Sequence, residues 1–195
     1  MKKLLITGFD PFGGETLNPS WEAVKRLPDQ IGAFSLTKLE IPTQFGLAAQ
    51  TVLAKAQEIA PDAILCVGQA GGRDSITPEV VAINLREASI ADNAGLLAQN
   101  VPIDADGAAA FFATLPIRRM VSAVKEAGIP CKLSYSAGAF VCNDTLYTLL
   151  AHYVHTPTQV GFIHVPFLPE QAKEGIPSLP LEKICEALSV AIGAM

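Results

Sequence analysis

The sequence contains few charged residues and little positive charge. Charged side chains make up 17% of the 195 residues, and the formal net charge is −5 at pH 7. Proteins that bind nucleic acids need a basic face to neutralise phosphates, and no cluster of lysine or arginine supplies one. The composition therefore argues against a nucleic-acid-binding protein.

Long apolar runs are also absent. None approaches the roughly 20 residues that cross a bilayer. Residues 1–6 look like the start of a signal peptide, but Gly8, Asp10 and Pro11 interrupt the apolar segment too early. We expect a protein without a membrane span or a secretion signal.

Paired cysteines of the C-x-x-C type are missing. The four cysteines are scattered, at Cys66, Cys131, Cys142 and Cys185. This spacing fits neither a zinc site nor a dense disulfide framework. The simplest interpretation is free thiols in a reducing cytoplasm.

Half of the residues are hydrophobic, which is typical of a compact globular protein. The length suits one well-filled core, so we expect a single domain over residues 1–195. Asn18 followed by Pro19 predicts a helix N-cap and first turn. Further helices are predicted at residues 45–60, 117–127, 143–153 and 181–192. Strands are predicted at residues 3–9, 34–41, 63–67, 80–85, 131–136 and 160–165, with residues 89–102 irregular or a hairpin.

Alternating strands and helices predict an α/β fold, a mostly parallel twisted sheet covered on both faces. In such sheets, ligands bind outside the carboxyl ends of the strands. The functional loops should therefore follow the strand ends near Phe9, Val67, Ser136 and Val165. No internal repeat or low-complexity segment is evident.

Two glycine-rich loops follow predicted strands. In residues 8–14, Phe9 and Phe12 either fold back on the core or form an apolar wall for a small ligand ring. In residues 68–79, Gln69 offers both a hydrogen-bond donor and an acceptor. Arg73 is either a surface residue or an ion-pair partner, and Glu79 is either solvated or functional. Neither loop has a phosphate-binding pattern, which weakens a nucleoside- or phosphate-handling enzyme as an alternative.

Among the cysteines, Cys142 stands out because it lies where a predicted strand and a short loop lead into a helix. Unpaired N–H groups and the positive end of the helix dipole favour a thiolate there. The other three are interpreted as small buried side chains or as having no chemical role. His164, near a strand end, is either a core residue or a catalyst. Together with Glu79, these residues form a candidate constellation for cysteine nucleophilic catalysis.

The motifs around these residues match a known family in order along nearly the whole chain. They are Gly8-Phe9-Asp10-Pro11-Phe12-Gly13-Gly14 with Asn18-Pro19-Ser20, Gly68-Gln69-Ala70-Gly71-Gly72-Arg73 with Glu79, Ala82-Ile83-Asn84, Asp92-Asn93, Ser136-Ala137-Gly138, Val141-Cys142-Asn143 and His164-Val165-Pro166. The chain thus resembles the pyroglutamyl peptidase I family of cysteine peptidases, also called pyrrolidone carboxyl peptidases.

This resemblance implies removal of N-terminal pyroglutamyl residues from peptides through a thioester acyl-enzyme. It also implies a single three-layer α/β/α domain, no metal or cofactor, and a homo-oligomer, often a tetramer. Cys142 would be the nucleophile, His164 the general base and then acid, and Glu79 the residue that orients His164. Phe9, Phe12 and Gln69 match positions associated with the pyroglutamyl pocket.

One position departs from the family pattern. Ser89 stands where the family typically has an arginine thought to lie near the catalytic cysteine. On an extended segment, Arg86 would point to the opposite face from position 89. The departure favours a non-catalytic or weakly active pyroglutamyl-binding homologue as the alternative, and the intact Glu79, Cys142 and His164 oppose it.

Overall fold

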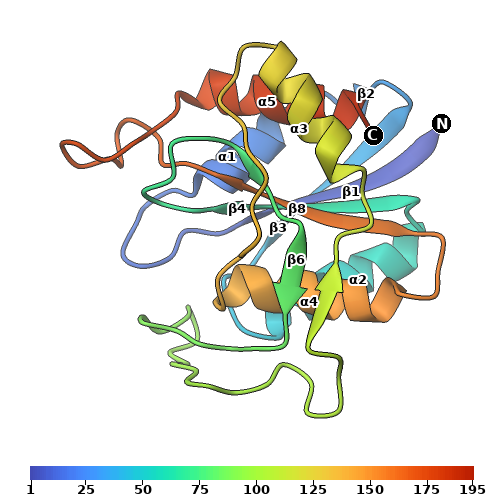
Figure 1. Ribbon diagram of the computed structural model, residues 1–195, viewed down its shortest axis with the longest axis vertical. Coiled ribbons are helices and arrows are strands. Elements are labelled where there is room, and N and C mark those ends of the chain that lie inside the picture. The colour runs from blue at the N-terminus through green and yellow to red at the C-terminus, as the bar shows by residue number, and fades with distance from the viewer.

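A six-stranded sheet forms the centre of the molecule in the computed structural model, which describes residues 1–195 (Figure 1). Its strand order is β2-β3-β1-β4-β8-β5. The strands are β1 (Lys2–Phe9), β2 (Gln30–Ile31), β3 (Phe34–Ile41), β4 (Ala63–Gln69), β5 (Thr77–Pro78) and β8 (Gln159–Val165). The four central strands are parallel, and the two short edge strands are antiparallel to their neighbours. The prediction of a mostly parallel sheet is confirmed.

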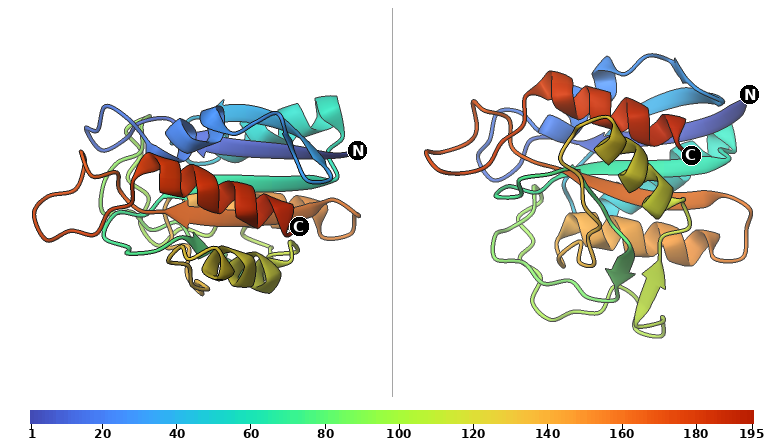
Figure 2. Two further views of the ribbon diagram at one scale, coloured as in Figure 1. Left: turned by 90° about the horizontal axis from the view of Figure 1, so that it is seen from above. Right: turned by 45° about the horizontal axis from the view of Figure 1, so that its top comes forward.

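Helices cover both faces of this sheet. Helices α1 (Pro19–Arg26), α3 (Ile117–Glu126) and α5 (Leu181–Gly193) lie on one face, and α2 (Leu47–Ile59) and α4 (Val141–Tyr153) lie on the other (Figures 1 and 2). Each face has its own buried hydrophobic cluster. None of the helices is both long and apolar enough to span a membrane. The three-layer α/β/α class predicted from the sequence is confirmed.

The central strands are apolar along their length because both of their faces are buried. In β1, Leu4 and Ile6 belong to one hydrophobic cluster, while Leu5 and Phe9 belong to the other. This alternation is the period-two geometry of a strand between two helical layers. The continuous apolar run thus predicts a central strand.

Most predicted elements lie where the sequence placed them, within two residues at each end. Asn18 caps α1, its Oδ1 accepting a hydrogen bond from the Ser20 N–H at 3.0 Å. Helix α4 begins at Val141, two residues earlier than predicted. Cys142 therefore lies within the first helical turn and not before it.

The prediction of a regular strand at residues 131–136 is wrong. This segment is extended, but it makes only isolated parallel bridges, from Cys131 to Ile76 and from Ser134 to Glu79. Its partner segment contains Pro78, which has no N–H to donate to the ladder between these two bridges. The other backbone bonds between the two segments form, among them those from the Lys132 N–H to the Ile76 carbonyl and from the Ser134 N–H to the Pro78 carbonyl.

A long excursion connects β5 to α3. The strand predicted at residues 80–85 is shorter, β6 (Val81–Ile83), and pairs with β7 (Ala110–Phe112) in a separate antiparallel ribbon. Residues 89–102 contain no helix or strand, as one of the two sequence interpretations expected. The ribbon lies against α4, which carries Cys142.

Candidate active site

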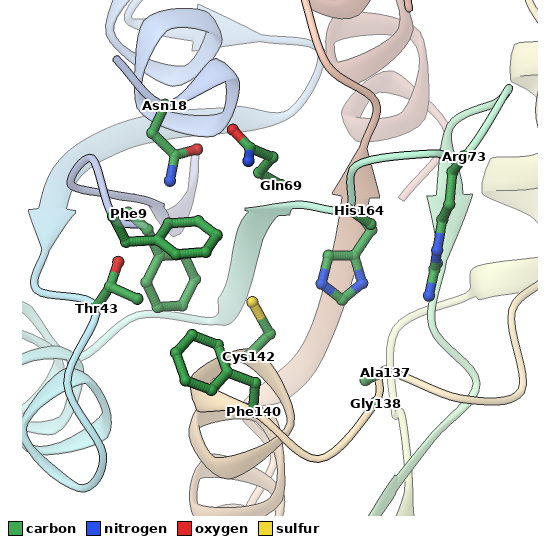
Figure 3. Close-up of a pocket in the computed structure, with 12 residues that line it drawn as sticks. Phe9, Asn18, Thr43, Gln69, Arg73, Ala137, Gly138, Phe140, Cys142 and His164 are labelled. Atoms are coloured by element: carbon green, nitrogen blue, oxygen red, sulfur yellow. The ribbon is translucent and has the colours of Figure 1, made fainter. Parts of the chain in front are cut away.

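A pocket of about 170 Å³ opens at the carboxyl ends of the central strands (Figure 3). It is lined by the five predicted residues Phe9, Phe12, Gln69, Cys142 and His164, together with Asn18, Thr43, Ala70, Arg73, Ala137, Gly138 and Phe140. The sixth predicted residue, Glu79, lies behind His164 and is fully buried. The sheet topology therefore brings together residues from five separate segments of the chain.

Cys142 is held in place by the start of helix α4. The side chain of the next residue, Asn143, accepts a hydrogen bond from the Ile83 N–H at 2.9 Å and donates to the carbonyls of Ile83 and Leu85. These three bonds fasten the first turn of α4 to the segment of β6. The helix has no side-chain cap, and its first internal bond runs from the Asp144 N–H to the Phe140 carbonyl. The backbone N–H of Cys142 is thus left without an acceptor in the chain.

The protonation state of Cys142 differs from the sequence expectation. Burial raises the pKa of the thiol well above its ordinary value, and the negative charge of Glu79 raises it further. The positive charge of Arg73 opposes this shift but does not reverse it. The helix start is expected to favour a thiolate, but burial and the charge of Glu79 act against it and raise the pKa of the thiol. The resting nucleophile is a neutral thiol that needs a base.

His164 and Glu79 form a buried pair beside this thiol. Nδ1 of His164 lies 2.7 Å from Oε1 of Glu79, and the residues are 3% and 0% exposed. The antiparallel pairing of β5 with β8 brings the carboxylate here, since Thr77 pairs with His164. Burial lowers the pKa of His164, against the opposite influence of Glu79. The imidazole is therefore neutral at rest, and its contact with Glu79 leaves Nε2 as the free nitrogen.

The carboxylate of Glu79 stays ionised. Burial alone would raise its pKa, but the hydrogen bond and charge of His164, with Ser134 and Arg73, hold the pKa below its usual range. Glu79 thus accepts a hydrogen bond from His164 and fixes the ring orientation. Of the two sequence interpretations of Glu79, solvated or functional, its burial excludes the first.

The backbone at Gly68 passes directly beneath the nucleophile. Gly68 pairs with His164 in the register of β4 and β8. A Cβ atom at this position would lie 2.9 Å from Sγ of Cys142 and 2.7 Å from Cζ of Phe162. Only glycine leaves room for the thiol in its observed position.

We expect Gly68→Ala to reduce kcat/KM by about 100-fold, since displacing a reacting atom by roughly 1 Å can cost that much. The measurement is kcat/KM for the substrate class that the family resemblance implies, a pyroglutamyl amide, together with the melting temperature. Gly161→Ala is the matched control, because its Cβ would meet Leu115 at 2.7 Å, a core clash away from the thiol. Loss of stability in both variants with full activity in Gly68→Ala would contradict this role of Gly68.

Aromatic rings form one wall of the pocket. Phe9 is 1% exposed and packs on Phe162, so both sequence interpretations hold: it belongs to the core and to the pocket. The Phe12 and Phe140 ring centroids are 5.9 Å apart, and Phe140 also meets Phe45 edge-on at 5.3 Å. These rings offer an apolar slot for a flat or ring-shaped ligand group.

Amide groups supply the polar part of the pocket. Oε1 of Gln69 accepts a hydrogen bond from Nε2 of Gln171 at 3.1 Å, which leaves the Gln69 amide N–H groups to donate elsewhere. Asn18, on the same side of the pocket (Figure 3), uses its side chain to cap α1 and to donate to the Asp10 carbonyl. Apart from Arg73, the polar groups that line the pocket are therefore uncharged in this region, with the Gln69 amide N–H groups available to a ligand.

Several lining residues were not predicted from the sequence. Thr43 follows β3, whose end is not among the strand ends expected to precede functional loops. Asn18 was interpreted only as a helix cap. Phe140, next to the helix start, carried no signal beyond being aromatic. Arg73 was left open between a surface role and an ion pair, and it pairs with Glu79 at 2.7 Å.

Ser89 and Arg86 both lie outside the pocket lining. Ser89 is exposed, in the irregular segment that follows β6. Nε of Arg86 pairs with the buried Asp144 carboxylate at 2.6 Å, and its guanidinium lies over the Phe45 ring. Arg86 therefore braces helix α4, and the positive charge that acts on the Cys142 thiol is that of Arg73.

No three histidine, cysteine, aspartate or glutamate side chains come together in a way that could hold a metal ion. The chemistry available at the pocket is that of a thiol, an imidazole, a carboxylate and backbone N–H groups. This combination suits acyl transfer through a cysteine nucleophile.

Comparisons with known proteins agree with this chemistry. A family model described as pyroglutamyl peptidase matches residues 2–195. The pyrrolidone-carboxylate peptidase of Enterococcus faecalis is 50% identical, over 98% of this chain and 92% of that protein. The crystal structure of pyroglutamyl peptidase I from Bacillus amyloliquefaciens superposes with a TM-score of 0.95 at 47% identity, covering 100% of this chain and 96% of the other. The pyrrolidone carboxyl peptidase from Thermococcus litoralis gives a TM-score of 0.94 at 34% identity, covering 100% and 93%.

Proposed function

The chain belongs to the pyroglutamyl peptidase family of cysteine peptidases, and on this premise we propose that Cys142, His164 and Glu79 carry out its reaction. The substrate is a peptide with an N-terminal pyroglutamyl residue, and the products are free pyroglutamate and the shortened peptide. The observation that carries the proposal is the His164–Glu79 pair beside a thiol in a pocket of rings and amides.

The first half-reaction makes a thioester. Nε2 of His164 takes the proton of the Cys142 thiol as Sγ attacks the carbonyl carbon of the pyroglutamyl residue. The tetrahedral intermediate collapses as the C–N bond breaks, and His164 gives the proton to the leaving amine. Glu79 stabilises the imidazolium that exists between these two proton transfers. In the second half, His164 activates water, which hydrolyses the thioester and releases pyroglutamate.

The negative charge that develops on the substrate's carbonyl oxygen in the tetrahedral intermediate needs hydrogen-bond donors. The Cys142 N–H lies in the first turn of α4 and has no acceptor in the chain, so it supports a role as an oxyanion donor. One such donor contributes about 3 kcal/mol to transition-state stabilisation in other enzymes. The positive end of the α4 dipole acts in the same direction.

The ligand ring is bound by the aromatic wall of Phe9, Phe12 and Phe140. A pyroglutamyl ring is an uncharged lactam, so it needs apolar contact and hydrogen-bond partners for its carbonyl and N–H. The amide of Gln69 is available as a donor to the lactam carbonyl. No lysine lines the pocket, and its single arginine is paired with Glu79.

We expect a pyroglutamyl chromogenic amide to be cleaved at least about 100-fold more efficiently than the matching prolyl amide. Proline keeps the ring shape but lacks the lactam carbonyl, so it would leave polar groups of the site unpaired. The measurement is kcat/KM for both substrates with the same enzyme preparation. Equal cleavage of the two amides would contradict the proposed recognition of the lactam.

Family membership also bears on the domain organisation, cellular location and oligomeric state of the protein. We infer that residues 1–195 act as one peptidase domain, working in the cytoplasm, since all four thiols are free. A homo-oligomer, by family resemblance a tetramer, is supported by exposed apolar side chains along the excursion after β5, among them Ile90, Leu96, Leu97 and Phe112. Ser89, the departure that favoured a non-catalytic binding protein, lies outside the pocket lining, and nothing in the structure supports that alternative.

A further inference from the structure

Arg73 makes an unusual set of contacts for a residue at the rim of a pocket. Its NH1 donates to Oε1 of Glu79 at 2.7 Å, to the Thr77 hydroxyl at 2.5 Å and, more weakly, to the Ser134 hydroxyl at 3.4 Å. Its NH2 donates to the Ser136 carbonyl at 3.0 Å. Figure 3 shows the guanidinium on the far side of His164 from the aromatic wall. One side chain thus joins β5, Glu79 and the segment that leads into α4.

The Glu79 carboxylate has few hydrogen-bond or ion-pair partners besides Arg73. Glu79 is 0% exposed, and its Oε1 serves both His164 and Arg73 at 2.7 Å each. The second oxygen, Oε2, is buried without a hydrogen-bond partner. A buried carboxylate with one unpartnered oxygen is stable only when paired with a cation. His164 is neutral at rest, so the permanent cation is Arg73.

The charged and titratable groups around Glu79 form a small set. They are His164 from β8, Cys142 from α4, and Arg73 from the loop after β4. The charge of Arg73 lowers the pKa values of both His164 and Cys142, against the opposite influence of Glu79. Burial is the main cause of the lowered pKa of His164, and the charge of Arg73 acts in the same direction.

We propose that Arg73 is a positioning residue that acts through Glu79, keeping this carboxylate charged and directed at Nδ1 of His164. The inference rests on the proposed function, since it assigns Arg73 a part in the same reaction. It also explains how the site has a positive charge near the thiol although position 89 is a serine. The same side chain also donates a hydrogen bond to the carbonyl of Ser136, which precedes Ala137 and Gly138 of the pocket lining.

The test compares Arg73→Met with Arg73→Lys on a pyroglutamyl amide. Arg73→Met is expected to lower kcat by about 100-fold, in the range of general acid–base contributions, with KM within about threefold. The acid limb of its pH profile moves to higher pH, because no cation at position 73 opposes protonation of His164. Arg73→Lys is expected to return the acid limb of the pH profile to its wild-type position and to raise kcat at least about tenfold above that of Arg73→Met. Lysine restores the positive charge but not the forked hydrogen-bond donors of the guanidinium.

Lys132→Met is the matched control. Lys132 is a nearby cation that pairs with Asp74 at the surface, and its removal is expected to leave kcat, KM and the pH profile unchanged. In a Glu79→Gln background, Arg73→Met is expected to add less than about a threefold loss, because a residue acting through Glu79 has nothing left to act on. If Arg73→Met does not fold, Arg73→Gln serves as the neutral variant with the same expectations.

Three results would overturn the inference: wild-type kcat in the neutral variant, a loss confined to KM, or an undiminished loss in the Glu79→Gln background. Cys142→Ala, assayed in parallel, separates this failure from failure of the proposed function. Activity in Cys142→Ala would refute the reaction itself. An inactive Cys142→Ala beside a fully active Arg73→Met would refute only the role of Arg73.

Discussion

Cys142→Ala is expected to lower kcat for a pyroglutamyl amide by roughly 10⁴-fold or more, as removal of a covalent nucleophile does in other enzymes. Alanine removes Sγ, and no other thiol lines the pocket. The one hydroxyl in the lining, that of Thr43, donates its proton to the Asp10 carbonyl at 3.2 Å and has no base beside it. The ring wall and Gln69 are untouched, so binding of a pyroglutamyl ligand should persist. Steady-state kinetics measures the loss of kcat, and calorimetry on the same variant measures whether the pyroglutamyl ligand still binds.

The control for this substitution is Cys185→Ala. Cys185 is a partly exposed free thiol on α5, on the opposite face of the sheet from α4. The Cys185→Ala variant should retain the kcat and the KM of the wild type. Measurable wild-type turnover in Cys142→Ala, after exclusion of contaminating peptidase by active-site titration, would remove Cys142 from the mechanism.

His164→Ala is expected to slow acylation by about 10³-fold, within the range of general acid–base catalysis. Burial holds the pKa of Cys142 above its ordinary value of 9.0, so the thiol ionises poorly without a base. The variant's rate should therefore rise with pH into the alkaline range. The folded state should be kept, because Arg73 remains as the ion-pair partner of Glu79 when the imidazole is removed.

The pH profile of the wild-type enzyme completes this prediction. Burial lowers the pKa of His164 from its ordinary value of 6.5, so the neutral base persists below that pH. The acid limb of kcat/KM should lie below pH 6.5 in the wild type and vanish in His164→Ala. His152→Ala, at the exposed end of α4, is the control. Unchanged turnover or an unchanged acid limb in His164→Ala would exclude His164 as the base.

Much of the fold could be predicted because its signals are local. A strand buried on both faces needs an unbroken apolar run, and residues 63–67 have one. A helix needs a start signal, and Asn18 followed by Pro19 supplies one by its chemistry. Since the carboxyl ends of parallel strands meet at one edge of the sheet, the strand ends near Phe9, Val67 and Val165 predict that Phe9, Gln69 and His164 lie close together.

The remaining errors come from interactions that are not local. The missing N–H of Pro78 breaks a ladder with residues 131–136 that are distant in sequence. The raised pKa of Cys142 depends on how closely other segments surround the thiol, and helix position alone suggested the reverse. The sequence likewise left Arg73 open, since only the folded chain brings its guanidinium against Glu79 and Ser136.

The central claim is that Cys142 carries the pyroglutamyl group as a thioester between the two half-reactions. Mixing the enzyme with a rapidly acylating pyroglutamyl ester, quenching in acid and mapping the digested protein by mass spectrometry tests it directly. The account predicts the mass of one pyroglutamyl acyl group on the peptide that contains Cys142, lost on further incubation, and none on the peptides with Cys66, Cys131 or Cys185. Turnover with the acyl group on another residue would contradict it.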